Sequence, residues 1–132
     1  MNTGETIKKA GLKATLQRKM IYEAMRELRH STIDGVIAKV QQQNLEITLS
    51  TVYRILDSFC KVGLLSTINH PNGKCYYDIT SGEHHHVFDN NEIIDYIDLK
   101  LTELIKNHLK DELYKDLDIE KVSIQITVNN KK

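Results

Sequence analysis

The stretch from position 50 to position 79 carries the pattern that most constrains the fold: an amphipathic helix followed directly by a hairpin. Four apolar residues fall at the i, i+3, i+4 and i+7 positions of a helix: Val52, Ile55, Leu56 and Phe59. Ser50 is the expected cap of this helix, and Gly63 marks its end. Segments 64–70 and 75–79 flank Pro71, Asn72 and Gly73, which are typical turn residues. The pattern therefore predicts a helix and then two antiparallel strands.

Further helical segments precede this pair of elements. A short helix is expected over 3–10 with Thr3 as its cap, and a longer one over Thr15–Leu28, where apolar residues recur at helical spacing. Ser31 is expected to open another helix that ends near Asn44. Three helices followed by a hairpin is the order of a winged helix, which is a DNA-binding helix-turn-helix variant.

The last fifty residues have a different organisation. Short strands are expected at 84–88 and 92–96, and a helix over about 98–114. Residues 122–128 alternate strictly between apolar and polar, which predicts a half-buried strand. A β-β-α-β unit of this size buries too little surface to be stable by itself, so we expect dimerisation through it. The fold class is therefore α+β.

The predicted domains are a winged helix-turn-helix domain over residues 1–80 and a small α/β dimerisation domain over residues 81–132. Charge follows a similar division. Residues 1–78 contain 11 Lys and Arg against 7 Asp and Glu, whereas residues 79–132 contain 7 Lys and Arg against 11 Asp and Glu. A basic front half suits a polyanionic partner, although an excess this small is weak evidence by itself.

Composition excludes several classes of protein. No apolar run approaches the ~18 residues of a membrane helix, and Met1–Glu5 lacks a basic-then-apolar leader. We therefore expect a cytoplasmic protein that does not contact a membrane. Cys60 and Cys75 are far apart and form no Cys-x-x-Cys motif, so no thiolate zinc site is indicated. Cys60 is expected to pack in the core.

The outward side of the helix that begins near Ser50 is suited to reading DNA. Serine and threonine hydroxyls in its first turn can bond phosphates, tyrosine offers a ring for a thymine methyl, and arginine can take a guanine edge or a phosphate. The start of the helix over 15–28 and the hairpin add basic residues. The candidate DNA-binding residues are Lys13, Thr15, Arg18, Ser50, Thr51, Tyr53, Arg54 and Lys74. An ordinary amphipathic helix with a solvated face is the alternative.

Three consecutive histidines lie between the two halves of the chain. Alternate side chains of a strand share a face, so His84 and His86 point one way and His85 the other. With Asp78 and Asp95 able to fold back toward this pair, the stretch is a candidate metal site with nitrogen and oxygen donors. A solvated polar turn between strands would show the same residues, and this alternative remains open from the pattern alone.

Four motifs together resemble the Fur family of metal-responsive bacterial repressors. They are the segment 12–18 (Leu-Lys-Ala-Thr-Leu-Gln-Arg), the segment 50–56 (Ser-Thr-Val-Tyr-Arg-Ile-Leu), the pair Tyr77 and Asp78, and the histidine triplet. The resemblance runs from about residue 11 to the final strand. It implies a cytoplasmic homodimeric transcription repressor that binds double-stranded operator DNA through an N-terminal winged helix.

The peroxide-sensing PerR branch of this family is the most similar. The resemblance implies one regulatory site per protomer for Fe(II) or Mn(II), with Zn(II) as a substitute in purified protein. Its ligands would be His30, Asp78, His84, His86 and Asp95. Iron sensors more usually carry Glu at the position of Asp95. Peroxide would then oxidise a ligand histidine, His30 or His84, and release the DNA.

The chain departs from the family pattern in two places. Residues 87–92 stand where the family's Cys-x-x-Cys follows the histidines, and the second cysteine pair is also missing, so we expect no structural zinc. The other common regulatory site is degraded, with Gln125 near the position of its strand histidine and Thr102 in place of a carboxylate, although Glu103 is adjacent. The dimer is therefore expected to rely on apolar packing and strand pairing.

Three alternatives remain beside the peroxide sensor. The first is an iron-uptake regulator without the oxidative step. The second, of another class, is a metal-dependent hydrolase that uses the histidines and a carboxylate. A hydrolase would leave the Thr51–Arg54 segment unexplained, so we expect that the protein is not an enzyme. The third is a degenerate family member that binds DNA regardless of metal.

Overall fold

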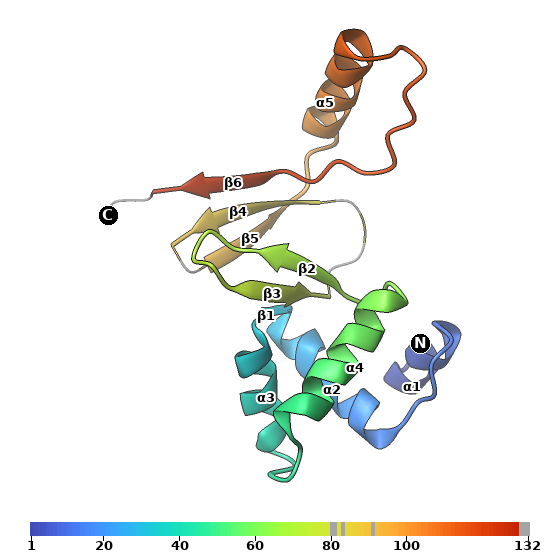
Figure 1. Ribbon diagram of the computed structural model, residues 1–132, viewed down its shortest axis with the longest axis vertical. Helices are drawn as coiled ribbons and strands as arrows, with labels where there is room; N and C mark the ends of the chain where they lie inside the picture. The colour runs from blue at the N-terminus through green and yellow to red at the C-terminus, as the bar shows by residue number, and fades with distance from the viewer. Residues whose placement is uncertain (80–81, 83, 91, 130–132) are drawn as a thin grey trace. The chain divides into compact units, whose positions relative to one another are not determined.

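The computed structural model describes residues 1–79, 82, 84–90 and 92–129 (Figure 1). The chain forms two compact units, Met1–Ser81 and Gly82–Lys132, each of which has its own sheet. In the described residues, no helix is both long and apolar enough to cross a membrane. The mixture of helices with small, separate sheets makes this an α+β protein, as predicted.

The first unit packs helices against one side of a short hairpin (Figure 1). Its helices are α1 (Thr3–Lys9), α2 (Leu16–Leu28), α3 (Ile33–Gln41) and α4 (Leu49–Lys61). Its core takes buried apolar residues from all four helices and from the hairpin, including Ile21, Val36, Phe59 and Tyr77. In α4 the buried residues are the four that the helical spacing predicted. The opposite side of α4 is therefore left exposed.

The cap of α4 is Thr48, two residues before the predicted Ser50. The Thr48 hydroxyl oxygen accepts from the Thr51 backbone N–H at 3.2 Å and donates to the Thr51 hydroxyl at 3.1 Å. A cap side chain accepts from the N–H of the second or third helical residue, and from position 48 the third is Thr51. Ser50 instead lies exposed within the first turn, where its hydroxyl is not needed to close the helix.

The starts of α1 and α3 also differ from expectation by one residue. Asn2 rather than Thr3 caps α1, because its side-chain oxygen accepts from the Glu5 backbone N–H at 2.8 Å. Thr32 rather than Ser31 caps α3. Ser31 instead belongs to the two-residue strand β1 (His30–Ser31), which the sequence did not indicate.

Strand β1 completes a three-stranded sheet with the hairpin strands β2 (Ser66–Asn69) and β3 (Cys75–Asp78). The order is β1-β3-β2 and both pairings are antiparallel. In this register His30 stands directly opposite Asp78. A winged helix with its expected hairpin is thus present, and the added strand brings a histidine to the end of β3.

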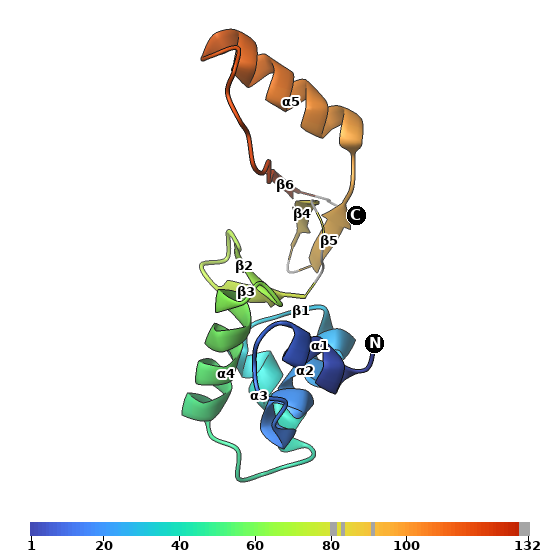
Figure 2. The same ribbon diagram turned by 90° about the vertical axis from the view of Figure 1, so that its right-hand side faces the viewer.

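The second unit is a β-β-α-β arrangement, as predicted. It contains β4 (His85–Asp89), β5 (Glu92–Tyr96), α5 (Leu99–Glu112) and β6 (Gln125–Val128). The strand order is β5-β4-β6, with β4 antiparallel to β5 and parallel to β6. Helix α5 leads away from the sheet and a long segment returns to β6 (Figures 1 and 2). This crossover is what allows β6 to run parallel to β4.

Strand β6 is shorter and more exposed than the alternating pattern predicted. It covers four residues, all of them exposed in the single chain. The register places Ile94, Val87 and Ile126 in one row across the sheet, and Ile94 and Ile126 are 43% and 37% exposed. The expectation of a half-buried strand therefore does not hold for one chain, since α5 does not cover this row.

Candidate metal centre and nucleic-acid interface

The first unit holds a histidine and a buried carboxylate side by side. His30 on β1 and Asp78 on β3 are paired across the sheet, and His30 Nε2 lies 3.5 Å from Asp78 Oδ1. Asp78 is only 1% exposed. Burying a carboxylate is costly unless a cation or hydrogen-bond donors compensate, so a buried Asp beside an imidazole is typical of a functional position.

Arg29 sets the direction in which His30 enters the sheet. Its φ of 65° lies in the left-handed region, which is uncommon for a residue with a side chain. Its backbone N–H closes α2 on the Met25 carbonyl, and its own carbonyl accepts from the Ile79 N–H at 3.2 Å. The chain thus turns sharply between the end of α2 and β1, and His30 is held next to the strand that carries Asp78.

The second unit holds the other three predicted ligands together. His86 on β4 is directly opposite Asp95 on β5, and His84 lies just before β4 on the same face. The Nε2 atoms of His84 and His86 are each 3.7 Å from the same oxygen, Asp95 Oδ1. The two rings meet edge to face at 4.6 Å, and both histidines are buried. The two imidazole nitrogens therefore both lie near one carboxylate oxygen.

A hydrogen bond fixes the tautomer of His84. Its Nδ1 lies 2.9 Å from the Gly82 carbonyl oxygen. Because a carbonyl can only accept, Nδ1 carries the proton, and in the neutral ring Nε2 is left with a lone pair directed toward Asp95. Metal-binding histidines characteristically donate their other ring N–H to a carbonyl or carboxylate in this way.

Both clusters fit a divalent ion as judged by donor chemistry and spacing. Imidazole nitrogens with carboxylate oxygens suit first-row divalent metals. Two donors that are each ~2.1 Å from one ion lie ~3.0–3.6 Å apart at usual bond angles. The separation is 3.5 Å in the first cluster, within this range, and 3.7 Å in the second, slightly above it. Each unit therefore presents donors of a suitable kind: two residues in the first and three in the second.

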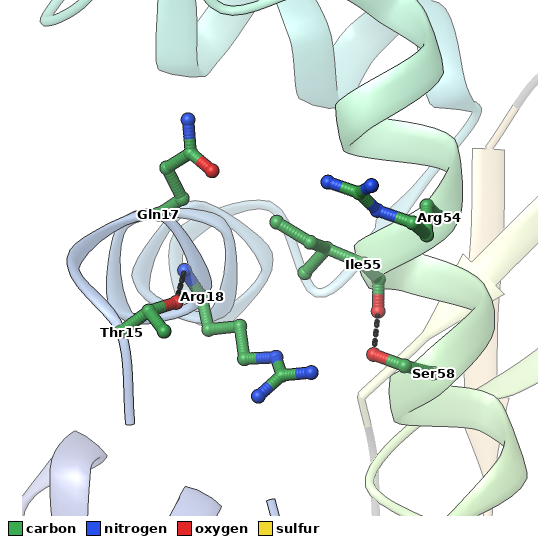
Figure 3. A pocket seen from close by; sticks show the side chains of 6 residues that line it. All are labelled: Thr15, Gln17, Arg18, Arg54, Ile55 and Ser58. Atoms are coloured by element: carbon green, nitrogen blue, oxygen red, sulfur yellow. Dashed lines mark hydrogen bonds between the residues drawn. The ribbon is translucent and has the colours of Figure 1, made fainter. Parts of the chain in front are cut away.

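A hollow of about 250 Å³ lies between the start of α2 and the exposed side of α4 (Figure 3). Ile55 points from α4 toward α2, and the guanidinium groups of Arg18 and Arg54 lie on either side of it. Thr15 caps α2 through the Arg18 N–H at 3.2 Å, and Arg18 Nη1 donates to the Lys13 carbonyl at 2.8 Å. The positively charged side chains of Arg18 and Arg54 thus line the hollow, and the Arg18 hydrogen bond also fixes the backbone at Lys13.

A second hollow, of about 360 Å³, opens at the start of α4 and is lined by Ile33, Leu49, Ser50 and Tyr53. Leu49 and Tyr53 are 50% and 58% exposed, which is unusual for such large apolar groups on one helix end. Leu49 was missed in the sequence because the expected cap at Ser50 placed it outside the helix.

The remaining candidates and two further hollow-lining residues are placed as follows. Thr51 is half-buried in the first turn of α4, while Lys13 and Lys74 are exposed in the loop before α2 and on the hairpin. Gln17 and Ser58 also line the hollow between α2 and α4 and were not among the candidates. Neither had a sequence signal, because isolated polar residues on a helix are ordinary.

Cys60 packs against the core of the first unit, as predicted. Burial, followed by the nearby charge of Asp57, raises the pKa of its thiol. Burial likewise raises the pKa of the Tyr77 hydroxyl to about 12. A thiol with a raised pKa is less reactive than an ordinary cysteine, so Cys60 is poorly suited to sensing oxidants.

Comparison with known proteins gives a consistent result. A sequence model of the ferric uptake regulator family (FUR) matches residues 9–128. The ferric uptake regulation protein of Bordetella parapertussis is 36% identical over 87 residues, a match that covers 64% of this chain and 63% of the relative. The chain thus spans less than two thirds of that relative's length.

Two solved structures are similar over the whole chain. The Pseudomonas aeruginosa ferric uptake regulator with manganese has a TM-score of 0.82 and 26% identity, with 100% of both chains covered. The Campylobacter jejuni peroxide stress regulator has a TM-score of 0.71 and 31% identity, with 100% of this chain and 98% of that chain covered.

Proposed function

The chain belongs to the ferric uptake regulator (Fur) family, whose members are dimeric, DNA-binding transcription regulators rather than enzymes, and from this premise we propose that it is a metal-dependent repressor that senses peroxide. The metallohydrolase alternative is set aside by this membership. The observation that carries the metal dependence is the convergence of His84 Nε2 and His86 Nε2 on Asp95 Oδ1 at 3.7 Å each. A regulator of this kind acts on the genome and therefore in the cytoplasm.

The DNA-binding surface is the exposed side of α4 with the start of α2. Arg18 and Arg54 face the hollow of Figure 3 and supply positive charge for phosphates. Ser50, Thr51 and Tyr53 lie in the first turns of α4, the part of a recognition helix that meets base edges. Lys13, Thr15 and Lys74 are proposed to contact the adjacent sugar-phosphate backbone.

One divalent ion, Fe(II) or Mn(II), is proposed to be held by His30 and Asp78 of the first unit and by His84, His86 and Asp95 of the second. The manganese-containing relative supports the choice of ion. The role of the ion would be to draw both ligand sets into one shell, so that the reading helix is presented in a single orientation. Shifting such an equilibrium from 1:99 to 99:1 requires ~5.5 kcal/mol of differential binding.

The protein's own residues prepare both ligand sets. The Gly82 carbonyl holds the proton of His84 on Nδ1, which leaves Nε2 ready to bind. The β1–β3 register holds His30 beside the buried Asp78. No thiolate is required, since Cys60 packs against the core with a raised pKa. Ligands aligned in advance reduce the ordering cost of binding.

The peroxide response is the finer part of the proposal. One oxygen atom of peroxide would be added to the ring of a ligand histidine and the other would leave as water, and a bound Fe(II) would supply the redox chemistry for this step that Mn(II) lacks. His30 and His84 are the proposed targets, and loss of either would weaken the ligand set and release DNA. The likeness to the Campylobacter jejuni peroxide stress regulator, at 31% identity over the whole chain, supports this branch.

The second candidate is an iron-uptake regulator without the oxidative step. It is favoured by relatives that are named for iron uptake, such as the Bordetella parapertussis ferric uptake regulation protein. In this reading iron occupies the same ligands, and peroxide leaves the histidines intact.

Metal-dependent DNA binding is tested first. Duplexes selected from a random pool by the Mn(II)-loaded protein serve as the probe, and affinity is measured with Mn(II) and with a chelator. We expect tight binding that chelation abolishes. His84→Ala should remove the response to Mn(II), while His108→Ala, an exposed histidine on α5, serves as the control and should keep it. A DNA affinity that is the same with and without the chelator would instead indicate a protein that binds DNA regardless of metal.

The two sensing candidates are separated by adding peroxide to the Fe(II)-loaded and Mn(II)-loaded protein on DNA. A peroxide sensor loses DNA only in the iron form and gains oxygen on His30 or His84, which peptide mass spectrometry detects. Retention of DNA with both metals, and unmodified histidines, would favour the iron-uptake regulator.

A further inference from the structure

The middle histidine of the triplet, His85, is used differently from its neighbours. It is 1% exposed and points to the face of the sheet opposite His84 and His86. Its Nε2 lies 2.8 Å from the Thr102 hydroxyl on α5, and its Nδ1 accepts from the Ile124 backbone N–H at 3.1 Å. One side chain on β4 is therefore bonded to α5 and to the segment that enters β6.

These contacts determine which atom donates and which accepts in each hydrogen bond from Ile124 through His85 and Thr102 to Asp98. The Ile124 N–H can only donate, so Nδ1 has no proton, and the neutral ring carries its proton on Nε2. Nε2–H therefore donates to Thr102 Oγ1, whose own hydrogen is donated to the Asp98 carbonyl at 3.0 Å. Both ring nitrogens of His85 are occupied by protein groups, and this tautomer is the opposite of that of His84.

Both backbone polar groups of Ile124 are bonded to adjacent residues of β4. Its N–H donates to the His85 side chain, and its carbonyl accepts from the His86 backbone N–H at 2.9 Å. This connection lies one residue before the start of β6, across a crossover of 12 residues from the end of α5. His86, a proposed ligand, therefore bonds through its backbone N–H to the same residue that His85 bonds through its side chain.

We infer that His85 is a positioning residue for the metal site rather than a ligand: its bonds to Ile124 and Thr102 hold β4 in the rotation that directs His84 and His86 at Asp95. The inference rests on the proposed metal-binding function.

The coupling follows from strand geometry. Successive side chains of a strand point to opposite faces, so a rotation of β4 that displaces His85 on one face displaces its neighbours on the other. Residues that orient metal ligands from outside the coordination shell typically change metal affinity ~10–100-fold when removed. The ligand set and the number of ions bound should stay the same.

Substitutions at two positions separate a positioning role from a ligand role. His85→Ala removes both bonds. His85→Asn places an oxygen near the position of Nδ1 and can still accept from Ile124, whereas His85→Gln places its amide near Nε2 and can still reach Thr102. Thr102→Val removes the acceptor of Nε2–H from α5 with little change of shape. Thr127→Val, an exposed threonine on β6, is the control.

Mn(II) affinity and stoichiometry, the Co(II) absorption spectrum and the thermal midpoint of the metal-free protein are measured for each variant. We expect one ion per protomer and an unchanged Co(II) spectrum throughout. Mn(II) affinity should fall ~10–100-fold in His85→Ala and measurably in Thr102→Val, with no change in Thr127→Val. His85→Asn should recover more affinity than His85→Gln, since it keeps the bond to the backbone N–H of Ile124, the residue whose carbonyl also accepts from His86.

Two results would overturn the inference. A lost ion or an altered Co(II) spectrum in His85→Asn would make His85 a ligand. A lowered thermal midpoint with Mn(II) affinity within twofold of the parent, in both His85→Ala and Thr102→Val, would make it a structural residue only. If the parent protein itself binds no Mn(II), or if His84→Ala binds it equally well, the proposed function fails instead, so the two failures are distinguishable.

Discussion

At the scale of single residues, the buried carboxylate of Asp78 gives the metal proposal its sharpest test. In Asp78→Asn the side chain keeps its shape but loses the negative charge 3.5 Å from His30. We expect the fold to persist and metal binding to weaken ~100-fold, in line with the loss of a ligand or of its orientation. A Mn(II) concentration that stabilises the parent by ~2.7 kcal/mol would then stabilise the variant by only ~0.4 kcal/mol.

The measurement is the rise in thermal midpoint on adding Mn(II). Asp111→Asn, which changes an exposed carboxylate on α5, is the matched control and should keep the full rise. An equal rise in Asp78→Asn and in the parent would remove Asp78 from the proposed ligand set.

Lys13 provides a test of the proposed DNA-binding surface, also at the scale of single residues. Its side chain is exposed, and its carbonyl is held by Arg18 at 2.8 Å, so the residue is well positioned for one phosphate. Lys13→Gln should reduce the salt dependence of DNA binding, the slope of log K against log salt, by ~0.9 per protomer. The slope is obtained from fluorescence anisotropy at several salt concentrations.

Lys61→Gln is the control for this slope, because Lys61 lies at the other end of α4 and pairs with Asp57 at 3.2 Å. Equal slopes for the parent and the Lys13 variant would place Lys13 outside the interface.

The faces on which the proposed ligands lie could be predicted from the sequence, but the protonation of their ring nitrogens could not. Alternation along a strand was enough to place His84 and His86 on one face and His85 on the other. The tautomers of His84 and His85 depend on the Gly82 carbonyl and the Ile124 N–H. Such backbone partners have no side-chain signature, and one of them is 39 residues distant in sequence.

At the scale of elements, the corrected cap of α4 makes a direct prediction. Thr48→Ala leaves the Thr51 N–H without its 3.2 Å partner and should lower the free energy of unfolding by ~1 kcal/mol. Ser50→Ala removes an exposed hydroxyl that does not cap the helix, and should change the free energy of unfolding by less than ~0.5 kcal/mol. Urea unfolding compares the two, and the reverse ranking would restore Ser50 as the cap.

The cap of α5 makes a prediction about pH. The Leu101 backbone N–H at 3.0 Å, and then the Tyr96 hydroxyl at 2.8 Å, lower the pKa of Asp98 from its ordinary value of 3.8. A lowered pKa favours the folded state while the group is ionised, so this contribution is complete above pH 3.8 and is lost as the pH falls below it.

Asp98→Asn keeps an oxygen for the Leu101 N–H but removes this titration. Thermal melts of the parent from pH 5 to pH 3 should therefore decline more steeply than those of Asp98→Asn at the acid end. Parallel curves for the two proteins would show that Asp98 contributes nothing to acid sensitivity.

Elements with a long apolar period were predictable, while those defined by pairing were not. Helix α4 has four buried residues at helical spacing, and its extent agrees with expectation within about two residues. Strand β1 has two residues, which is too short for any period, and it exists because His30 and Ser31 pair with β3. Strand β6 has the expected alternation but starts later, since its pairing with β4 includes only Gln125–Val128.

At the scale of the whole molecule, the apolar row of the second sheet predicts the state of assembly. Ile94, Val87 and Ile126 lie in one row with two of them over a third exposed, which favours burial against a second copy of the chain. Ile126→Lys should convert a dimer to a monomer in sedimentation experiments. Thr127→Lys adds the same charge to the opposite face of the strand and should leave the dimer in place. Dissociation by both or by neither variant would argue against this face.

The sequence changes from helical periods to short strands after Gly82, and the structure has two compact units, Met1–Ser81 and Gly82–Lys132. The apolar row was not visible, because it is assembled from three strands and needs their register. Sequence patterns give the face of one strand, whereas a row across a sheet depends on which residues become neighbours.

The two-residue pairing of His30–Ser31 with Tyr77–Asp78 also bears on how such a protein can diversify. A slip of one position there would turn His30 to the wrong side, because side chains alternate along a strand. The turn at 42–48 and the hairpin tip at 70–74 lie between the two paired segments in sequence and take no part in this pairing. We therefore expect that those loops can change in length without disturbing the pairing of His30 with Asp78.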